Sequence, residues 1–171
     1  MNIISLNTSP TLWDEVVNIF FESSSVKEFT DEKSKEEFLY KYLGYYKENY
    51  PEFFLVATFE NKVLGYICGS PNSLDDSELL GLLPHFGVFK DLYDDFPAHL
   101  HINLARASRG MGVGSKLVQR FESICRGGVH LITSPTARNK SFYLKNGYNF
   151  NDIRVFSGSD LLFMGKSIID R

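Results

Sequence analysis

The chain has 171 residues, of which 43% are hydrophobic and 15% aromatic, and its formal net charge is -3. This length fits a single domain over residues 1–171 with a normal core, and the apolar content excludes a disordered chain. Lys and Arg do not cluster, which argues against nucleic acid as the main partner. No stretch reaches the roughly 20 apolar residues of a membrane span. The N-terminus lacks a signal-peptide pattern, so we expect a cytoplasmic protein.

The N-terminal third predicts one strand and two helices. The stretch NIISL, residues 2–6, has the composition of a strand. Each of the two helices that follow begins with a capping box, in which a Ser or Thr and an acidic residue three positions later satisfy the first free amides of the helix. The two pairs are Thr11 with Asp14, for a helix over residues 11–23, and Ser34 with Glu37, for a helix that Pro51 ends.

The middle of the chain predicts a hairpin, a long connection and a further strand. Residues 53–59 and 63–69 are rich in aromatic and β-branched residues and flank the short polar turn ENK, which predicts an antiparallel hairpin. Residues 70–97 form a connection in which SELLGLL can make a short helix, and connections of this length are often functional. Between positions 71 and 97 it carries six acidic residues and one lysine. The alternating stretch 98–104 predicts a strand.

Three glycines at alternate positions, Gly110, Gly112 and Gly114, stand between that strand and a run of apolar residues with helical period. The run predicts a helix that begins in the glycine loop and ends at Gly127. Together the elements predict an α/β fold in which helices cover a mixed sheet. The last predicted elements are a strand over residues 129–134, a helix over 137–146 and a closing hairpin of 153–156 with 161–167.

The glycine loop has the pattern of an anion site, because unpaired N–H groups and the positive end of the helix dipole converge where a strand leads through glycines into a helix. A dinucleotide fingerprint and a nucleotide P-loop both fail, since Ser115 stands where each requires a glycine. The spacing that fits is Arg109-x-x-Gly112-x-Gly114, a basic residue and spaced glycines that grip the diphosphate of coenzyme A.

Two motifs carry a resemblance to a known family. LHINLARASRGMGVGSKLVQRF resembles the acyl-CoA signature of the GNAT superfamily of N-acetyltransferases, and NKSFYLKNGYNF resembles its downstream FYxxxGF signature. Within it, YICGSP, FPAHLHINL and GGVHLITSP resemble the subgroup related to the acetyltransferase-like domain of O-GlcNAcases. The resemblance implies a mixed, mostly antiparallel sheet of six to seven strands with about four flanking helices. It also implies a splayed pair formed by strands 98–104 and 129–134.

The resemblance further implies acetyl-CoA as the cofactor and direct attack of an amine on the thioester in a ternary complex. The two cysteines lack the spacing of metal ligands, so we expect no metal. The backbone at the end of strand 98–104 would hold the pantetheine arm, and the glycine loop would hold the diphosphate. The residues implied for coenzyme binding are Ile102, Asn103, Leu104, Ala105, Arg109, Gly110, Met111, Gly112, Val113, Gly114, Ser115, Thr136, Asn139 and Tyr143.

Tyr143 matches the family tyrosine that protonates the departing thiolate. A base must help the acceptor, because an amine with an ordinary pKa near 10.4 reaches its neutral form at pH 7 only at a cost of roughly 4.6 kcal/mol. Relatives often carry Asp where this chain has Asn103. His101, which shares a strand face with His99, is our preferred substitute, with Asp76 behind it.

The acidic connection favours a cationic acceptor, either a small-molecule amine or a protein lysine. Asn103 motivates an alternative reading, in which the chain is a degenerate acyl-CoA-binding module that acts as a sensor or scaffold. The sequence is compatible with a monomer and with a homodimer.

Overall fold

The computed structural model describes residues 1–168 and contains seven strands within that range. They are β1 (Asn2–Ser5), β2 (Leu55–Phe59), β3 (Lys62–Ser70), β4 (Ala98–Leu104), β5 (Val129–Thr133), β6 (Phe150–Phe156) and β7 (Ser159–Lys166). The hydrogen-bonded strand order is β1-β2-β3-β4-β5-β7-β6. Strands β4 and β5 pair in parallel, whereas β1 with β2, β2 with β3, β5 with β7 and β6 with β7 pair antiparallel. The predicted mixed α/β fold is confirmed.

Six α-helices occur within residues 1–168. They are α1 (Trp13–Ser23), α2 (Glu32–Leu39), α3 (Tyr45–Asn49), α4 (Ser77–Leu82), α5 (Val113–Glu122) and α6 (Lys140–Lys145). The helix expected to end at Pro51 is divided, because a π-helical turn over Tyr40–Gly44 separates α2 from α3. The long connection over residues 70–97 contains regular structure, because it forms α4 and then a 3₁₀ helix over Pro84–Leu92. None of the helices in this range is long and apolar enough to cross a membrane.

Both predicted capping boxes are wrong. Thr11 lies inside a 3₁₀ turn that precedes α1, and no side chain caps that helix within the described part of the chain. Helix α2 begins at Glu32, and its cap is Asp31, whose Oδ1 accepts the backbone N–H of Ser34 at 2.7 Å. Aspartate and serine cap helices about equally well. Asp31 takes the role because the chain is extended there, and Ser34 serves as the donor.

Contacts divide the chain into two compact units. Unit 1 comprises Met1–Gly69 and His101–Ile124, and unit 2 comprises Ser70–Leu100 and the chain from Cys125 onward. Strand β4 therefore begins in unit 2 and ends in unit 1. The expectation of one domain over the whole chain stays a prediction.

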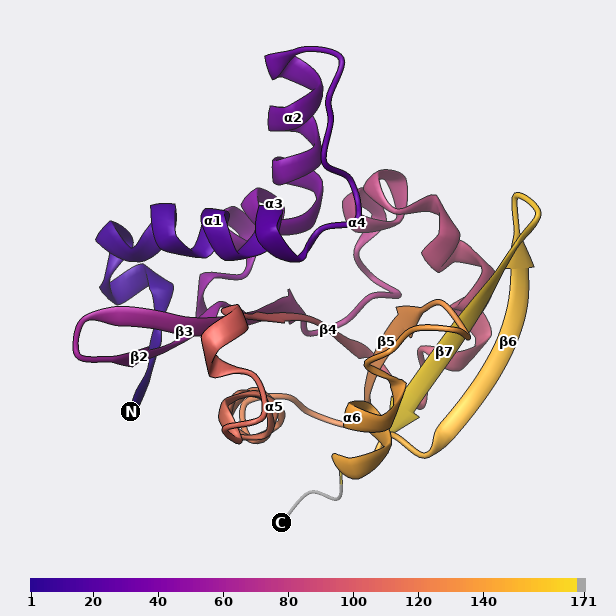
Figure 1. Ribbon diagram of the computed structural model, residues 1–171. Coiled ribbons are helices and arrows are strands. Elements are labelled where there is room, and N and C mark those ends of the chain that lie inside the picture. The colour runs from indigo at the N-terminus through magenta and orange to yellow at the C-terminus, as the bar shows by residue number, and fades with distance from the viewer. Residues whose placement is uncertain (169–171) are drawn as a thin grey trace. The chain divides into compact units, whose positions relative to one another are not determined.

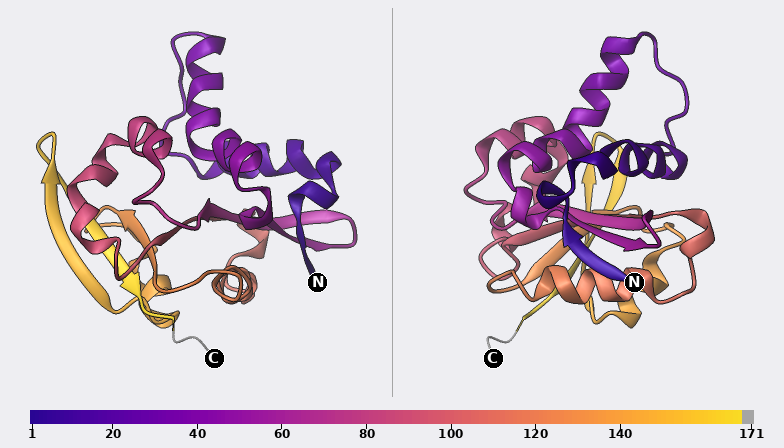
Figure 2. Two further views of the ribbon diagram at one scale, coloured as in Figure 1. Left: turned by 180° about the vertical axis from the view of Figure 1, so that it is seen from behind. Right: turned by 90° about the vertical axis from the view of Figure 1, so that its left-hand side faces the viewer.

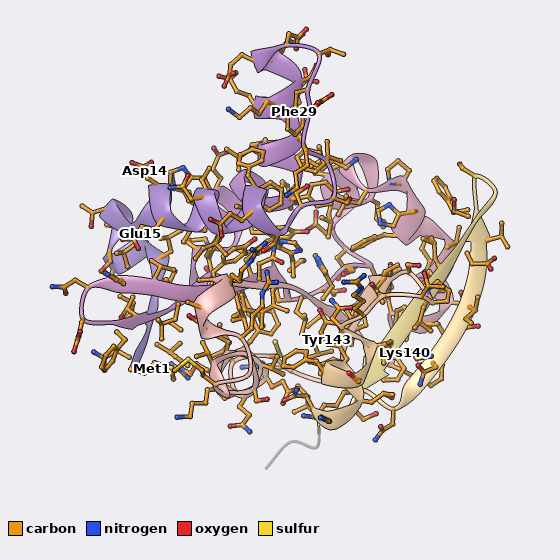
Figure 3. All side chains as sticks on the ribbon, in the orientation of Figure 1. Met1, Asp14, Glu15, Phe29, Lys140 and Tyr143 are labelled. Atoms are coloured by element: carbon orange, nitrogen blue, oxygen red, sulfur yellow. The ribbon has the colours of Figure 1, made fainter. Side chains whose placement is uncertain are left out.

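In unit 1, α1 and α5 lie on opposite faces of β2 and β3, and α2 extends away from these strands (Figure 1, Figure 2). Glu15 fixes α1 to the sheet, because its carboxylate accepts the backbone N–H of Val63 at 3.0 Å. Figure 3 shows Glu15 on the side of α1 toward β3 and Asp14 on the opposite side. On the other face, the rings of Phe53 and Phe121 meet edge to face at 5.8 Å, which packs α5 against the sheet.

In unit 2, buried aromatic rings surround His130 on β5. Its imidazole makes stacked contacts with Tyr93 and with Phe163, each at a centroid distance of 4.8 Å, and these two rings also lie near each other, at 6.4 Å. Its Nδ1 lies 2.7 Å from the carbonyl oxygen of Phe96. On β6, Arg154 donates from Nη2 to Asp91 at 2.8 Å, which ties this strand to the 3₁₀ helix. The unit thus has a core of its own around β5 and β7.

The ladder between β4 and β5 is short. It pairs Ala98 with Val129 and His99 with His130, which are the first two residues of each strand. In the neighbouring pair of β2 and β3, the ladder skips Leu64 of β3, so this residue forms a bulge. Its carbonyl accepts the N–H of Ala105 at 2.9 Å. The expected pairing of β4 with β5 is present and parallel, and the splay of this pair stays a prediction.

Candidate active site

The glycine loop leads from β4 into α5 and has an unusual backbone. Gly110 and Gly112 have φ angles of 78° and 77°, in the left-handed region that only glycine adopts without strain. A Cβ atom at either position would meet no heavy atom within 4 Å. Close packing is therefore not the reason for glycine here. The missing side chains leave open space directly in front of the backbone.

The amides at the start of α5 face no competing partner in the helix. The N–H of Lys116 donates to the carbonyl of Gly112 at 3.2 Å, so the amides of Val113, Gly114 and Ser115 precede this first helical hydrogen bond. No side chain among the described residues caps the helix. Free amides and the helix dipole together favour an anion. A coenzyme diphosphate fits this cradle, because open space and free donors coincide.

Arg109 lies at the entrance of the loop and is exposed. Its Nη2 donates to the carbonyl of Leu104 at 3.4 Å and to Ser23 Oγ at 3.5 Å. These bonds are long and weak, so the guanidinium can exchange them for a stronger anionic acceptor. Met111 is also exposed, at 72% of its full surface. The side chain of Met111 therefore adds little to the packing of the loop.

The end of β4 lies close to β3. A Cβ on Gly65 would come within 2.8 Å of the Asn103 carbonyl and 3.1 Å of Leu104 Cα, so glycine permits this approach. The N–H of Ala105 donates to β3, and the carbonyl of Leu104 accepts from Arg109. Of the backbone groups that the resemblance assigns to the pantetheine arm, these two already have partners within the protein.

Three side chains from β3 and β4 form a hydrogen-bonded triangle. Asn103 Nδ2 donates to the Tyr66 hydroxyl at 2.8 Å and lies 3.2 Å from His101 Nε2. The third side joins the Tyr66 hydroxyl to His101 Nε2 at 3.1 Å. Tyr66 is fully buried, whereas His101 and Asn103 are half-buried. We call this set of residues the His101 triangle.

Aromatic rings surround the imidazole of His101. Phe20 on α1 lies at 6.1 Å between centroids, and Tyr42 from the π-helical turn lies at 6.4 Å. Burial lowers the pKa of His101 to about 4, so the ring is neutral at pH 7. Burial also raises the pKa of Tyr42. Burial and, to a smaller extent, the electrostatic interaction with Cys68 hold the pKa of Tyr66 well above its ordinary range. All these groups are uncharged at neutral pH.

His99 lies on the same strand but in a different environment. It is 3% exposed and packs edge to face against Phe86 at 4.9 Å in the core of unit 2. Its ring lies 5.8 Å from that of His130. The strand therefore brings His101 and Asn103 together, as alternation predicts, and places His99 among core aromatics.

Three further predicted residues lie on or before α6. Tyr143 is 5% exposed and packs near Phe142 and Tyr148, with centroid distances of 5.2 and 6.0 Å (Figure 3). Burial raises the pKa of its hydroxyl, so it keeps its proton at pH 7. Asn139 precedes the helix, and its carbonyl accepts the N–H of Tyr143 at 3.3 Å. Thr136 is exposed and hydrogen-bonds Ser134 at 3.0 Å.

Asp76, the other predicted base candidate, caps α4. Its Oδ1 accepts the N–H of Leu79 at 2.9 Å, and its Oδ2 accepts the hydroxyl of Ser70 at 3.2 Å. The carboxylate is 6% exposed. Elsewhere in the acidic connection, Asp75 binds the amide of Asn72 and Asp91 binds Arg154. Three of the six acidic side chains thus have partners inside unit 2.

Sequence reasoning missed Tyr66 and did not place Tyr42 beside His101. The residues around Tyr66 predict a strand correctly, but alternation within one strand does not reveal which residues of the next strand lie beside it. Tyr42 belongs to a stretch with several tyrosines, and the π-helical turn that aims it at His101 has no clear sequence signal. A register between β3 and β4 would have been needed to find the triangle.

Comparison with known proteins places these features in context. The model of the acetyltransferase (GNAT) family matches residues 13–148. No curated protein matches the chain in sequence. Neither finding bears on the O-GlcNAcase-related subgroup, which stays a prediction.

Several solved structures share the fold over nearly the entire chain. The structure of SsHAT is 18% identical, with a TM-score of 0.72 over 97% of each chain. An aminoglycoside 6'-N-acetyltransferase complexed with coenzyme A is 16% identical, with a TM-score of 0.67 over 100% of this chain and 99% of that chain. Ard1 from Thermoplasma volcanium is 21% identical, with a TM-score of 0.60 over 99% and 98%. At such identities the likeness concerns the fold.

Proposed function

Since the chain belongs to the acetyltransferase (GNAT) family, we propose that it transfers the acetyl group of acetyl-CoA to a primary amine by direct attack. The single observation that carries this proposal is the glycine loop, where open space in front of Gly110 and Gly112 meets the free amides of α5. Acetyl-CoA is the cofactor of this family and supplies, when bound, the thioester that the amine attacks.

The loop binds and aims the coenzyme in this proposal. The amides of Val113, Gly114 and Ser115 hold the diphosphate, and Arg109 turns from its weak contacts to the same anion. The end of β4, from Ile102 to Ala105, guides the pantetheine arm. Because the backbone amides of the loop are fixed by the fold, they lose little freedom when the coenzyme binds.

Two residues handle protons in the proposed reaction. His101 accepts the proton that the amine loses; its lowered pKa keeps it unprotonated before the reaction and also makes it a weaker base than an ordinary histidine. Tyr143 donates from its hydroxyl to the departing sulfur, and its raised pKa keeps that proton in place until needed. A buried phenol is a weak acid, so its contribution is mainly a hydrogen bond to the developing thiolate. For Asp76 we propose the structural role of a helix cap.

The acceptor that fits best is a small-molecule amine or a lysine side chain. Aromatic faces of Phe20 and Tyr42 beside His101 suit a cationic amine before it loses its proton. One structural neighbour is an aminoglycoside acetyltransferase by name, and another is a ribosomal-protein-alanine acetyltransferase. A cytoplasmic location and the choice between monomer and homodimer stay predictions.

The test is release of free thiol from acetyl-CoA in the presence of a panel of polyamines, aminoglycosides and lysine peptides. We expect thiol release above background with at least one amine, and a Tyr143→Phe variant should retain coenzyme binding while its kcat falls. Tight coenzyme binding without turnover for any amine would instead favour the acyl-CoA sensor, the reading that Asn103 suggests. Absence of both binding and turnover would refute the proposal.

A further inference from the structure

We propose that Tyr66 and Asn103 position His101 by directing donors at Nε2, so that the neutral ring carries its proton on Nδ1 and takes up a further proton at Nε2. The role of His101 in catalysis rests on the function proposed above. The assignment of its tautomer does not, because it follows from the hydrogen bonds of the triangle alone.

Counting donors and acceptors in the triangle gives the tautomer. The amide nitrogen of Asn103 can only donate, and it lies within hydrogen-bond distance of both Tyr66 Oη and His101 Nε2. The Tyr66 hydroxyl accepts from this amide and has one proton of its own to donate. Among the described residues, His101 Nε2 is the acceptor within its reach. A protonated Nε2 would face the Asn103 donor and would leave the Tyr66 proton without an acceptor.

Because Tyr66 is buried, an unpaired donor on it carries a large energetic cost, which favours the tautomer with the proton on Nδ1. Tyr66 has none of its surface exposed, so its hydroxyl cannot turn to bulk water for an acceptor. A buried polar group without a partner costs about 1–3 kcal/mol, which is several-fold to more than a hundredfold in the ratio of the two tautomers. Phe20 and Tyr42, which also face the ring, bring no charge at neutral pH to oppose this preference.

The two partners act differently once His101 is protonated. A hydroxyl can reverse its role, so Tyr66 donates to the neutral ring and accepts from Nε2–H of the imidazolium, where its own proton then has no acceptor among the described residues. Asn103 has no such freedom and opposes the charged state. In the proposed reaction an N–H bond of the amine breaks, an Nε2–H bond forms, and the imidazolium carries the charge. Tyr66 is thus a positioning residue, which acts through His101 and not on the substrate.

Nitrogen-15 NMR of the protein without substrate tests the assignment, because the shift of a ring nitrogen reports whether it carries a proton. A His101→Gln variant identifies the signals. We expect Nδ1 protonated and Nε2 unprotonated near pH 7. In Tyr66→Phe the other tautomer should gain about fivefold in relative population, the equivalent of one hydrogen bond of about 1 kcal/mol. In Asn103→Ala the pKa of His101 should rise, since the neutral state loses a donor.

Tyr93→Phe is the matched control, because it also removes one buried tyrosine hydroxyl, which donates to the carbonyl of Phe86 at 2.7 Å in unit 2. It should leave the signals of His101 unchanged. If thiol release is established, Tyr66→Phe should lower kcat about tenfold without changing the KM for acetyl-CoA, and Tyr93→Phe should not. A protonated Nε2 in the wild type, or His101 signals indifferent to Tyr66→Phe, would overturn the assignment whether or not the protein transfers acetyl groups.

Discussion

Replacing Gly112 by Ala separates the two reasons for a glycine at the start of α5. One reason is the backbone, since φ is 77° and an L residue is strained there. The other is space, since a Cβ would project into a region that is open within 4 Å. Only the second reason involves a ligand. We therefore expect Gly112→Ala to reduce stability slightly and to weaken coenzyme A binding strongly.

The magnitudes follow from the geometry. Left-handed backbone costs an L residue roughly 1–2 kcal/mol, and the stiffer unfolded chain returns about 0.4–1 kcal/mol. The net loss of about 1 kcal/mol lowers Tm by roughly 2–4 °C in a chain of this size. The methyl group also keeps an anion away from the amides beneath it. Losing one hydrogen bond to a charged oxygen, worth about 1.5–3 kcal/mol, weakens binding by at least about tenfold.

Gly158→Ala is the control that isolates the ligand. Gly158 lies in the turn between β6 and β7, has a φ of 78° and likewise has no heavy atom within 4 Å of an added Cβ. Both variants should therefore lose similar stability in a thermal melt. Calorimetry with coenzyme A should show weakened binding for Gly112→Ala alone. Equal affinities for both variants and the wild type would refute the assignment of the loop as the diphosphate site.

Two further predictions concern unit 2. His130 has its pKa lowered to about 3 by burial, below the 6.5 of an unfolded chain. The contribution of His130 to the free energy of unfolding is therefore fully present above pH 6.5 and is lost as the pH drops toward 3. At pH 5 this residue alone should lower the free energy of unfolding by about 2 kcal/mol. Urea midpoints at pH 7 and 5 measure the loss, and His130→Phe should reduce it; an unchanged difference would contradict the reasoning. Asp76→Asn should keep both the α4 cap and thiol release, because Asn caps as well as Asp, whereas Asp76→Ala should lower the free energy of unfolding by about 1 kcal/mol. A stable but inactive Asp76→Asn would restore Asp76 as the base.

Local patterns predicted the elements well where one rule acted alone. Strand β4 was expected over residues 98–104 from its alternation and has those bounds. The helix after the glycine loop was expected from its apolar period, and α5 begins at Val113. The caps were mispredicted because Asp31 and Ser34 both suit the start of α2, and the extended backbone at Asp31 decided between them.

The candidate site divides in the same way. The glycine loop was predictable because a backbone with positive φ favours glycine, and Gly110 and Gly112 are therefore visible in the sequence itself. The His101 triangle was not, since it depends on which residue of β3 stands beside His101 across the strand pair. The two strands approach closely at Gly65, and the carbonyl of Leu64 accepts the N–H of Ala105, and single-strand periodicity reveals neither contact.

The π-helical turn between α2 and α3 bears on how the chain can change in length. Each residue of a helix rotates its successors by about 100°. In the π-helical turn the hydrogen bonds join residues five apart, so its five residues cover about the rotation that four residues cover in a regular helix. The turn thus takes up one extra residue while Tyr45 and Tyr46 stay buried at 2% and 1% exposure and Tyr42 faces His101. Deleting one residue between Tyr40 and Gly44 should therefore keep both flanking helices in register with the core, and it should change only the side chains of the turn, Tyr42 among them.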